Sequence, residues 1–188
     1  MRLILASTSN YRRELLARLR LPFEHSAPDF AEAPVGSMPT AALVRFNTLG
    51  KASSVLAKHP GAVVIASDQL AVCGQLTLGK PGDVQAACEQ LRLVSGRSVE
   101  FLTGLTLMTA DKTLFDLIPF RVFFRHLTDD EIQTYVKIEQ PLDCAGSFKS
   151  EGLGISLFER MAGDDPTALI GLPLIRLSQW LKPLNLLT

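Results

Sequence analysis

Cysteine and histidine are scarce in this chain, and neither is arranged as in a zinc site. The 188 residues include three cysteines, Cys73, Cys88 and Cys144, which form no CxxC pair and no even set. The three histidines show no metal-ligand spacing. Cys144 also lacks the sequence context of an activated nucleophile, which argues against a cysteine hydrolase. We therefore expect buried or free thiols in a reducing compartment.

The chain also lacks an excess of charge of either sign and any long apolar run. Lysine and arginine together number 19, as do aspartate and glutamate, so the formal net charge is zero. This balance argues against broad binding to nucleic acid or to an anionic membrane. No apolar run approaches the ~20 residues of a membrane span. A strand-like run begins at Leu3, which leaves no room for a signal peptide, so we expect a cytoplasmic protein.

Two common nucleotide-binding motifs are missing as well. The sequence contains no GxGxxG fingerprint and no Walker A motif, so the Rossmann and P-loop classes are excluded. What the chain does have is 47% hydrophobic residues, enough for a sizeable core. Its length predicts one domain over residues 1–188, with two lobes around a cleft as a possible arrangement.

Strand-like and helical patterns alternate along the chain, which predicts an α/β protein with a parallel or mixed sheet. Asp83 and the capping box at Thr128 and Glu131 mark two helix starts, and Pro173 can begin a last helix. The expected strands cover residues 3–6, 62–66, 99–108, 114–124 and 155–161, and a long helix covers residues 40–58.

The most informative stretch is Ser7-Thr8-Ser9-Asn10-Tyr11-Arg12-Arg13. It follows an apolar run and begins a helix in which Tyr11, Leu15 and Leu19 repeat every four residues. Cations in the first turn oppose the helix dipole by about 0.3–1 kcal/mol each, unless an anion binds there. Backbone N–H groups, small hydroxyls and two guanidinium groups suit a phosphate chain. A solvated helix end with a serine cap is about equally consistent with the motif alone.

Three further polar residues are candidates for chemistry. Asp68 follows the buried run 62–66 and is expected at the carboxyl-terminal edge of the sheet, where open α/β folds place ligands. A turn or cap role is the ordinary alternative for it. Lys80, between Gly79 and Pro81, is either a ligand contact or an exposed turn lysine. Glu32 lies in a proline-flanked loop, and if it meets Asp68 in space the two would form a Mg²⁺ site.

Gly50 and a glycine-containing segment suggest the close approach of another group. Gly50 lies inside the helix expected over residues 40–58, next to Lys51, at a cost of ~1 kcal/mol relative to alanine. It either permits a backbone or ligand to approach, or is simply tolerated. The segment 145–152, Ala-Gly-Ser-Phe-Lys-Ser-Glu-Gly, is either a hairpin approach or part of a base or phosphate pocket, which we favour.

Together these motifs resemble the Maf family of nucleotide pyrophosphatases, and the resemblance covers essentially the whole chain. Within the family the chain is most similar to the 7-methyl-GTP pyrophosphatases of the YceF type. The stretches that carry the resemblance are residues 3–7, 12–13, 67–69, 79–81 and 146–152, with 125–128, 158–160 and 170–174 supporting the closer assignment.

The resemblance implies a mixed, twisted sheet flanked by helices, with two lobes around a cleft, as in Maf and ITPase-like proteins, and usually a homodimer. It also implies cleavage between the α- and β-phosphates of a nucleoside triphosphate, dependent on a divalent cation such as Mg²⁺ or Mn²⁺. The products would be a nucleoside monophosphate and diphosphate. The family is associated with removal of modified nucleotides and has been linked to arrest of cell division.

The resemblance assigns roles to ten residues of this chain. Asp68 corresponds to the general base, and Glu32 with Asp68 would lie at the metal. The phosphate-site residues would be Ser7, Arg12, Arg13, Lys51 and Lys80. The positions that separate substrate subclasses would be Tyr11, Gln69 and Glu151.

Two departures from the family pattern bear on these roles. Ala31 precedes Glu32 where the family often has aspartate, which either weakens metal binding or removes only an outer carboxylate. Tyr11 stands where similar sequences have tryptophan. A tyrosine ring can still attract an N7-methylated, positively charged base by about 0.5–2 kcal/mol, or it can pack on Leu15 as core.

Guanine recognition is expected to rest on Glu151. Its carboxylate can accept hydrogen bonds from both N1–H and the 2-amino group of guanine, a pair that pyrimidines do not offer. Three other functions remain open from sequence: a dTTP/UTP or broad purine pyrophosphatase, a non-catalytic nucleotide-binding regulator of cell division, and a phosphohydrolase that releases orthophosphate. Gln69 and Glu151 argue against the first.

Overall fold

The structure is a computed structural model that describes residues 2–186. The chain divides into two compact units, which are described separately. The first unit comprises the chain up to Gln69, Thr103–Ile118 and the chain from Asp165 onward. The second comprises Leu70–Leu102 and Pro119–Asp164.

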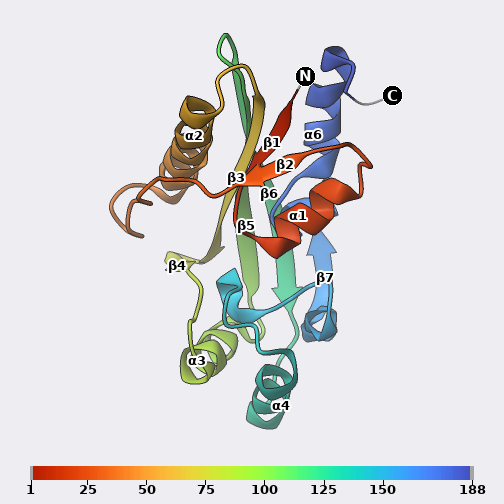
Figure 1. Ribbon diagram of the computed structural model, residues 1–188. Helices are drawn as coiled ribbons and strands as arrows, with labels where there is room; N and C mark the ends of the chain where they lie inside the picture. Colours follow the sequence, from red (N-terminus) through yellow and green to blue (C-terminus); the bar gives the residue numbers. More distant parts are fainter. Residues whose placement is uncertain (1, 187–188) are drawn as a thin grey trace. The chain divides into compact units, whose positions relative to one another are not determined.

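A mixed sheet of seven strands forms the framework (Figure 1). Its order is β2-β1-β3-β5-β6-β7, with β4 paired to β3. The strands are β1 (Leu3–Ala6), β2 (Glu24–Ser26), β3 (Val63–Cys73), β4 (Leu76–Leu78), β5 (Ser98–Met108), β6 (Thr113–Phe124) and β7 (Phe158–Ala162). Strand β1 is parallel to β2 and β3, whereas β4 and β7 are antiparallel to their neighbours. The expected mixed α/β fold is therefore confirmed.

Helices accompany these strands in both units. The α-helices are α1 (Asn10–Ala17), α2 (Thr40–Lys58), α3 (Val84–Val94), α4 (Asp129–Glu139), α5 (Pro166–Ile170) and α6 (Leu174–Leu181). Short 3-10 helices are η1 (Ala145–Ser147), η2 (Leu153–Leu157) and η3 (Lys182–Leu184).

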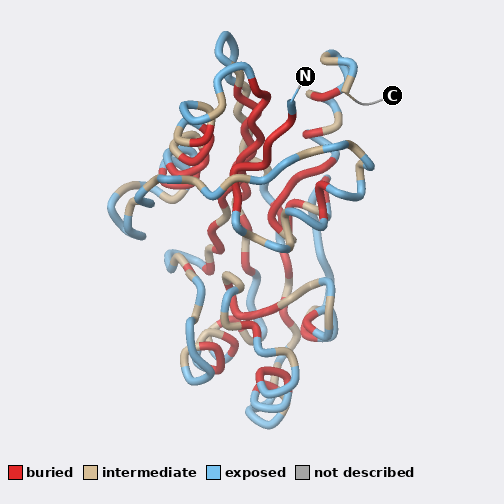
Figure 2. The backbone as a smooth tube through the Cα atoms, in the orientation of Figure 1, coloured by how far each residue is buried: buried red, intermediate tan, exposed pale blue. Residues whose placement is uncertain are grey.

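The first unit has a helix–sheet–helix arrangement that follows from side-chain alternation along the strands. On one sheet face, side chains of β1 and β3 pack with those of α1 and α6; they include Leu3, Leu5, Val63, Ile65, Leu15, Leu16, Leu177 and Leu181. On the opposite face, alternate strand residues pack against α2; they include Ile4, Ala6, Val64, Ala66, Ala52 and Val55. Both strands are accordingly buried along this unit (Figure 2). Burial of both faces accounts for their uninterrupted apolar runs.

The second unit is built around helices α3 and α4 and a cluster of aromatic rings. Asp83 caps α3 by accepting a hydrogen bond from Ala86 N at 2.8 Å, and Thr128 and Glu131 form the capping box of α4. Four phenylalanines pack edge to face with ring centroids 4.8–5.6 Å apart; they are Phe101, Phe124, Phe148 and Phe158. This cluster supplies the unit with core area that its short helices lack.

Most of the locally encoded elements are where the sequence places them. Helix α2 spans the predicted residues 40–58, Pro173 precedes α6, and β5 and β6 are adjacent strands joined by a short turn. The strand predicted over 155–161 is wrong at its start, because residues up to Leu157 belong to η2 and β7 begins at Phe158. Gly154 explains the difference: a side chain there would overlap the Lys149 carbonyl, so the chain is folded tightly on itself.

The cysteines agree with the expectation of buried or free thiols. Cys73, Cys88 and Cys144 are all free, and the first two are buried. Over residues 2–186, no helix combines the length and the apolar character needed to cross a membrane.

Candidate functional site

Asp68 lies within a strand, which corrects its predicted position after the strand end. The polar triplet Ser67-Asp68-Gln69 interrupts the apolar run, but β3 continues to Cys73 because its last residues pair with β4. Strand β3 pairs with β1 as far as Ile65, which lies opposite Leu5, and β1 ends at Ala6. Asp68 therefore lies just beyond the carboxyl end of the neighbouring parallel strand, where α/β folds bind ligands.

A buried ion pair joins Asp68 to helix α2. Lys51 Nζ lies 2.6 Å from Asp68 Oδ1, and their side chains are only 10% and 8% exposed. The same ammonium lies 2.7 Å from Glu32 Oε1, whose side chain is 55% exposed. Lys51 thus brings together two carboxylates from distant parts of the chain. Of its three N–H donors, two are directed at these carboxylates and one remains for another acceptor.

Asn47 completes this cluster and was not singled out from the sequence. Its Nδ2 donates to Asp68 Oδ2 at 3.3 Å, and its Oδ1 accepts from Ala33 N at 3.1 Å. Asn47 is buried and lies one helical turn before Lys51, so both reach the same carboxylate. The available signal in the sequence was an asparagine four residues before a lysine on a largely apolar helix face.

The turn between β1 and α1 contains the helix start at which we predicted that an anion binds. Ser9 caps α1 by accepting a hydrogen bond from Arg12 N, and the first turn contains no acidic residue. Ser7 is buried, and its Oγ accepts from Ser9 N at 3.1 Å. The serine cap and the arginines therefore coexist in one turn. A bound anion there would meet the positive end of the helix dipole.

Arg12 is the arginine directed into the first unit. Its Nε donates to Gly171 O at 2.9 Å, and the same carbonyl accepts from the buried Ser67 Oγ at 2.8 Å. Desolvation lowers the pKa of the Arg12 guanidinium, whereas the negative charges of Asp68 and Glu32 act to raise it. Arg12 is thus electrostatically coupled to both carboxylates and stays charged near neutral pH. Gly171 adopts φ +119°, a conformation that disfavours any side chain at this anchor.

The other residues expected in this unit have different surroundings. Arg13 is exposed, and its Nη2 donates to Asn10 Oδ1 at 2.8 Å within α1. Tyr11 is half-buried in the same first turn. Gln69 is half-buried, and its Nε2 donates to Thr103 Oγ1 at 2.9 Å and Ala168 O at 2.7 Å. Its protein contacts thus occupy the amide nitrogen, leaving the carbonyl oxygen as the atom available to a ligand.

Lys80 and Glu151 belong to the second unit and are not part of the Lys51 cluster. Lys80 is exposed and lies two residues after the end of β4. Glu151 is exposed, and its Oε2 accepts from Ser150 Oγ at 3.2 Å. Phe148, which we grouped with the pocket-forming segment 145–152, instead packs in the aromatic core.

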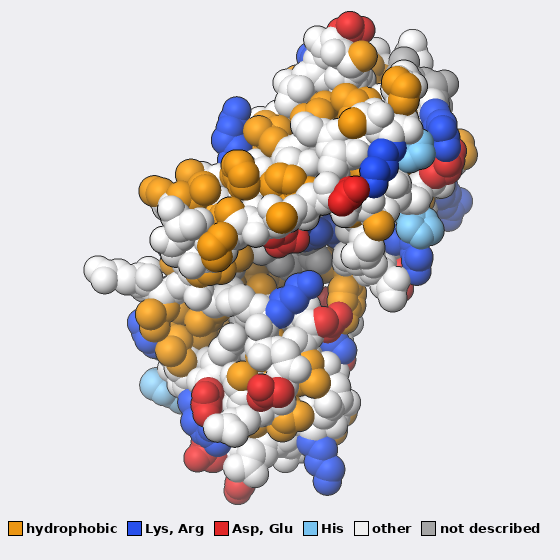
Figure 3. All heavy atoms as spheres, turned by 60° about the vertical axis from the view of Figure 1, so that its left-hand side comes forward, with side chains coloured by type: hydrophobic (Ala, Val, Ile, Leu, Met, Phe, Trp, Pro, Cys, Tyr) orange, Lys and Arg blue, Asp and Glu red, His pale blue; other side chains and the backbone are white. Residues whose placement is uncertain are grey.

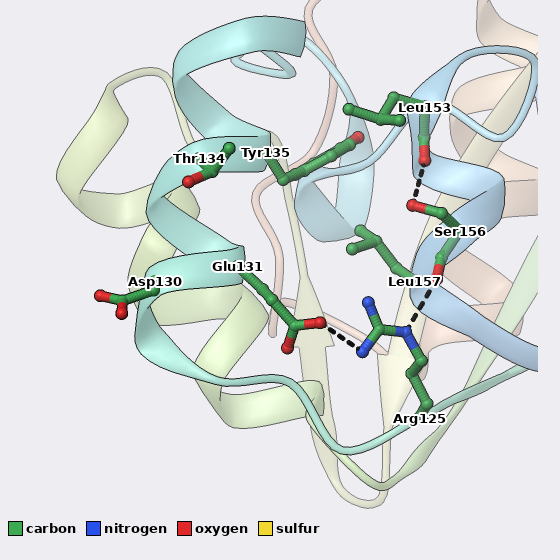
Figure 4. Close-up of a pocket in the computed structure, with 8 residues that line it drawn as sticks. All are labelled: Arg125, Asp130, Glu131, Thr134, Tyr135, Leu153, Ser156 and Leu157. Atoms are coloured by element: carbon green, nitrogen blue, oxygen red, sulfur yellow. Dashed lines mark hydrogen bonds and ion pairs between the residues drawn. The ribbon is translucent and has the colours of Figure 1, made fainter.

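A separate pocket of about 300 Å³ lies between α4 and η2 in the second unit (Figure 4). Arg125 and Glu131 form an ion pair of 2.7 Å on its wall, and Tyr135 and Leu157 supply apolar surface. None of the site residues predicted from the sequence lines it.

The Lys51 cluster has a donor set that suits a hard divalent cation. The facing oxygens belong to two carboxylates that contact the same nitrogen. Within residues 2–186 no group of three or more histidine, cysteine, aspartate or glutamate side chains forms a metal site. Mg²⁺ is commonly held by one or two carboxylates, with waters and substrate phosphates completing the octahedron. Glu32 and Asp68 therefore fit such an ion when a phosphate chain is present.

The mixed sheet, the helix start with its arginines and the adjacent carboxylate pair define an α/β protein with a candidate phosphate site. The family to which it belongs follows from its sequence. The chain belongs to the Maf-like protein family, whose model matches residues 2–184.

Curated relatives span nearly the same length as this chain. A protein of Pseudomonas putida named 7-methyl-GTP pyrophosphatase is 51% identical over 177 residues, covering 93% of this chain and 92% of its own. One of Nitrosococcus oceani with the same name is 53% identical over 184 residues, covering 96% and 92%. Among solved structures, the Staphylococcus aureus Ham1 protein is 16% identical, with a TM-score of 0.47 over 69% of this chain and 73% of its own.

Proposed function

We propose that this protein hydrolyses 7-methyl-GTP to 7-methyl-GMP and diphosphate and so removes a modified nucleotide from the pool. The observation that carries the proposal is the contact of Lys51 with both Asp68 and Glu32, in a unit that also holds Arg12 at a helix start. The relatives that share about half of its residues bear the name of this activity.

The phosphate chain would bind at the start of α1. Ser7, Arg12 and Arg13 supply hydroxyl and guanidinium donors there, and Lys51 has one N–H left for a phosphate oxygen. Two positive charges, on Arg12 and Lys51, already face two negative ones, on Asp68 and Glu32. A triphosphate brings about four negative charges, because its last ionisation lies near pH 6. Arg13, Lys80 and a divalent cation would supply the missing positive charge.

Asp68 is the residue we assign to the attacking water. Lys51 and Asn47 fix both of its oxygens from the α2 side, which sets the carboxylate plane. Each carboxylate oxygen retains a further lone pair, and one of these can accept a proton from water. The water oxygen attacks the α-phosphorus, the bond to the bridging oxygen of the β-phosphate breaks, and diphosphate leaves. Catalysis would come mainly from positioning and charge stabilisation.

A divalent cation, Mg²⁺ or Mn²⁺, would supply charge neutralisation for the phosphate oxygens and is assigned to Glu32 and Asp68. Arg12 and Lys51 would remain as the protein's own cations in this unit, and Arg12 is held by its hydrogen bond to Gly171 O. Ala31, the residue before Glu32, is exposed, so Glu32 is the carboxylate that this loop would offer to the cation.

Base selection is assigned to Tyr11, Gln69 and Glu151. Tyr11 lies in the turn that would hold the phosphates, where its ring can face a positively charged N7-methylated base. The Gln69 amide nitrogen is bound to Thr103 and Ala168, which orients its carbonyl oxygen as an acceptor. Glu151 is exposed and can accept from the guanine edge.

Replacement of Glu151 by glutamine should therefore reduce discrimination rather than general activity. We expect kcat/KM for 7-methyl-GTP to fall about 10- to 100-fold, as for loss of a charged hydrogen bond of about 1.5–3 kcal/mol. The value for UTP should change little. Glu159→Gln, an exposed glutamate of the same unit, is the matched control. An unchanged ratio of the two substrates in Glu151→Gln would remove Glu151 from the base site.

The reaction class is tested by assaying phosphate with and without added inorganic pyrophosphatase, over a panel of nucleotides with Mg²⁺ or Mn²⁺. Signal that requires the added enzyme indicates cleavage between the α- and β-phosphates. Signal without it indicates a phosphohydrolase that releases orthophosphate. Binding without turnover indicates a nucleotide-binding regulator, and a preference for dTTP and UTP indicates the other pyrophosphatase subclass.

The assembly and the location of the protein are further parts of the proposal. We expect a homodimer, as the family resemblance implies. We also expect a cytoplasmic protein that binds neither nucleic acid nor membrane, because its net charge is zero and its substrate belongs to the nucleotide pool. Light scattering of the purified chain, at several concentrations, measures the oligomeric state.

A further inference from the structure

The loop that carries Glu32 is long and has no regular structure of its own. Residues 27–39, between β2 and α2, contain neither helix nor strand. Loops of this length are commonly functional or disordered, so an ordered one needs specific anchors. Glu32 itself is more than half exposed, and its ion pair with Lys51 is a weak anchor by itself.

The loop is held most closely to α2 by the packing of Phe30 against Gly50. A Cβ atom on Gly50 would lie 2.6 Å from Phe30 Cδ2 and still closer to two other atoms of the same ring. Phe30 therefore sits directly on the helix backbone, in space that only glycine leaves open. Its ring also packs against Phe46, with centroids 5.5 Å apart. The cost of a glycine inside a helix is thus explained by the approach of Phe30.

The anchors of the loop lie along the same stretch of α2 as the site. Phe46 and Gly50 hold Phe30, while Asn47 accepts from Ala33 N and donates to Asp68. Lys51 contacts Glu32 itself. Residues three and four apart lie on the same helix face. The residues that contact Phe30 therefore lie beside those that contact Asp68 and Glu32. Figure 3 brings the α2 side forward and shows hydrophobic side chains exposed there; the large exposed ones of this helix and loop are Phe46 and Val35.

We propose that Phe30, seated on Gly50, is a positioning residue that holds Glu32 beside Lys51 and Asp68. The inference rests on the proposed function, because Glu32 is there assigned to the divalent cation. Phe30 lies two residues before Glu32 and Ala33 one residue after it, so the two anchors enclose it. Loss of either would free Glu32 from its fixed place while leaving Asp68 and Lys51 in contact.

Gly50→Ala should displace the Phe30 ring and thereby raise the Mg²⁺ concentration needed for half-maximal turnover. We expect a loss in kcat/KM of about 10- to 100-fold, the size associated with misplacement of a positioned group by about 1 Å. The melting temperature should not fall in parallel, because alanine is the better helix former. A variant that is stable yet poorly activated by Mg²⁺ separates positioning from folding.

A double-mutant cycle assigns the effect to the ring. Phe30→Ala should give a similar defect, and Gly50→Ala should add nothing in the Phe30→Ala background, because the new methyl group then meets no ring. Glu32→Gln should show the same Mg²⁺ phenotype, and Phe30→Ala should add little to it. Val35→Ala, an exposed change in the same loop, is the control and should leave all values unchanged.

Hydrogen exchange of residues 30–33 without nucleotide or metal gives a readout that does not depend on activity. Faster exchange in Gly50→Ala and Phe30→Ala, with Val35→Ala like the parent, supports the proposal whether or not the parent protein hydrolyses 7-methyl-GTP. An inactive parent protein would overturn the proposed function alone. Unchanged exchange in Gly50→Ala, or additive defects in the double variant, would overturn the role of Phe30.

Discussion

Asp68→Asn is expected to lose nearly all turnover of 7-methyl-GTP while it remains folded. Removal of a group that accepts a proton in the transition state costs about 10²–10⁴-fold in rate. Asparagine has the same shape, and its oxygen can still accept from Lys51 Nζ, which is 2.6 Å from Asp68 Oδ1 in the parent structure. Lys51 also keeps its second partner, Glu32. The amide nitrogen of the new side chain would face the Asn47 Nδ2 donor, so that one hydrogen bond is lost and the fold should tolerate the change at a modest cost in stability.

The measurement is kcat with saturating nucleotide and Mg²⁺, together with thermal melting. Asp116→Asn is a suitable control, because Asp116 is also ion-paired, with Arg176 at 2.7 Å, but has no assigned role. Near-normal turnover in Asp68→Asn would remove Asp68 from the position of base.

Lys51→Met should affect both activity and stability. The substitution retains most of the apolar stem and removes the ammonium, which leaves Asp68 as a buried carboxylate without its cation. Breaking a buried pair from one side costs about 3–5 kcal/mol of unfolding free energy. We also expect kcat/KM to fall by at least about 10²-fold, since the third N–H of Lys51 is assigned to the phosphates and its other two orient the carboxylates.

Urea unfolding measures the loss of unfolding free energy. A control variant in the same helix shows whether any lysine substitution in α2 has this effect. Lys58→Met removes a lysine from the same helix whose ion pair with Asp29 is exposed, and it should cost at most about 1 kcal/mol. Adding Asp68→Asn to Lys51→Met should recover part of the lost stability, because the uncompensated charge is then gone. Equal costs for the two lysines would contradict a buried ion pair at Asp68.

The sequence predicts well those features that depend on neighbouring residues. The cap at Asp83, the capping box at Thr128 and the full extent of α2 follow from residues within one or two helical turns. The arginines at the start of α1 belong to the same class, since a helix start and its dipole are local.

Features that depend on tertiary contacts were predicted only in part. The apolar run ending at Ala66 suggested that β3 stops there, but pairing with β4 carries it on to Cys73. The Lys51 ammonium contacts carboxylates that are 17 and 19 residues away along the chain. No pattern among neighbouring residues predicts contacts of this kind. Phe148 resembled a ligand contact in its glycine-containing segment, yet the rings of Phe101 and Phe158 enclose it.

The reason for a glycine at position 50 of α2 is a tertiary contact. A glycine in the middle of a helix indicates that something approaches closely, but not what. The structure identifies Phe30, twenty residues earlier, as the residue that fills the space beside Gly50.

Hydrolysis of 7-methyl-GTP in ¹⁸O-labelled water, followed by mass spectrometry of the products, tests the central claim most directly. The account predicts one ¹⁸O atom in 7-methyl-GMP and none in diphosphate, because the water held by Asp68 attacks the α-phosphorus. Label in diphosphate or orthophosphate, or no turnover by the folded parent protein, would contradict it.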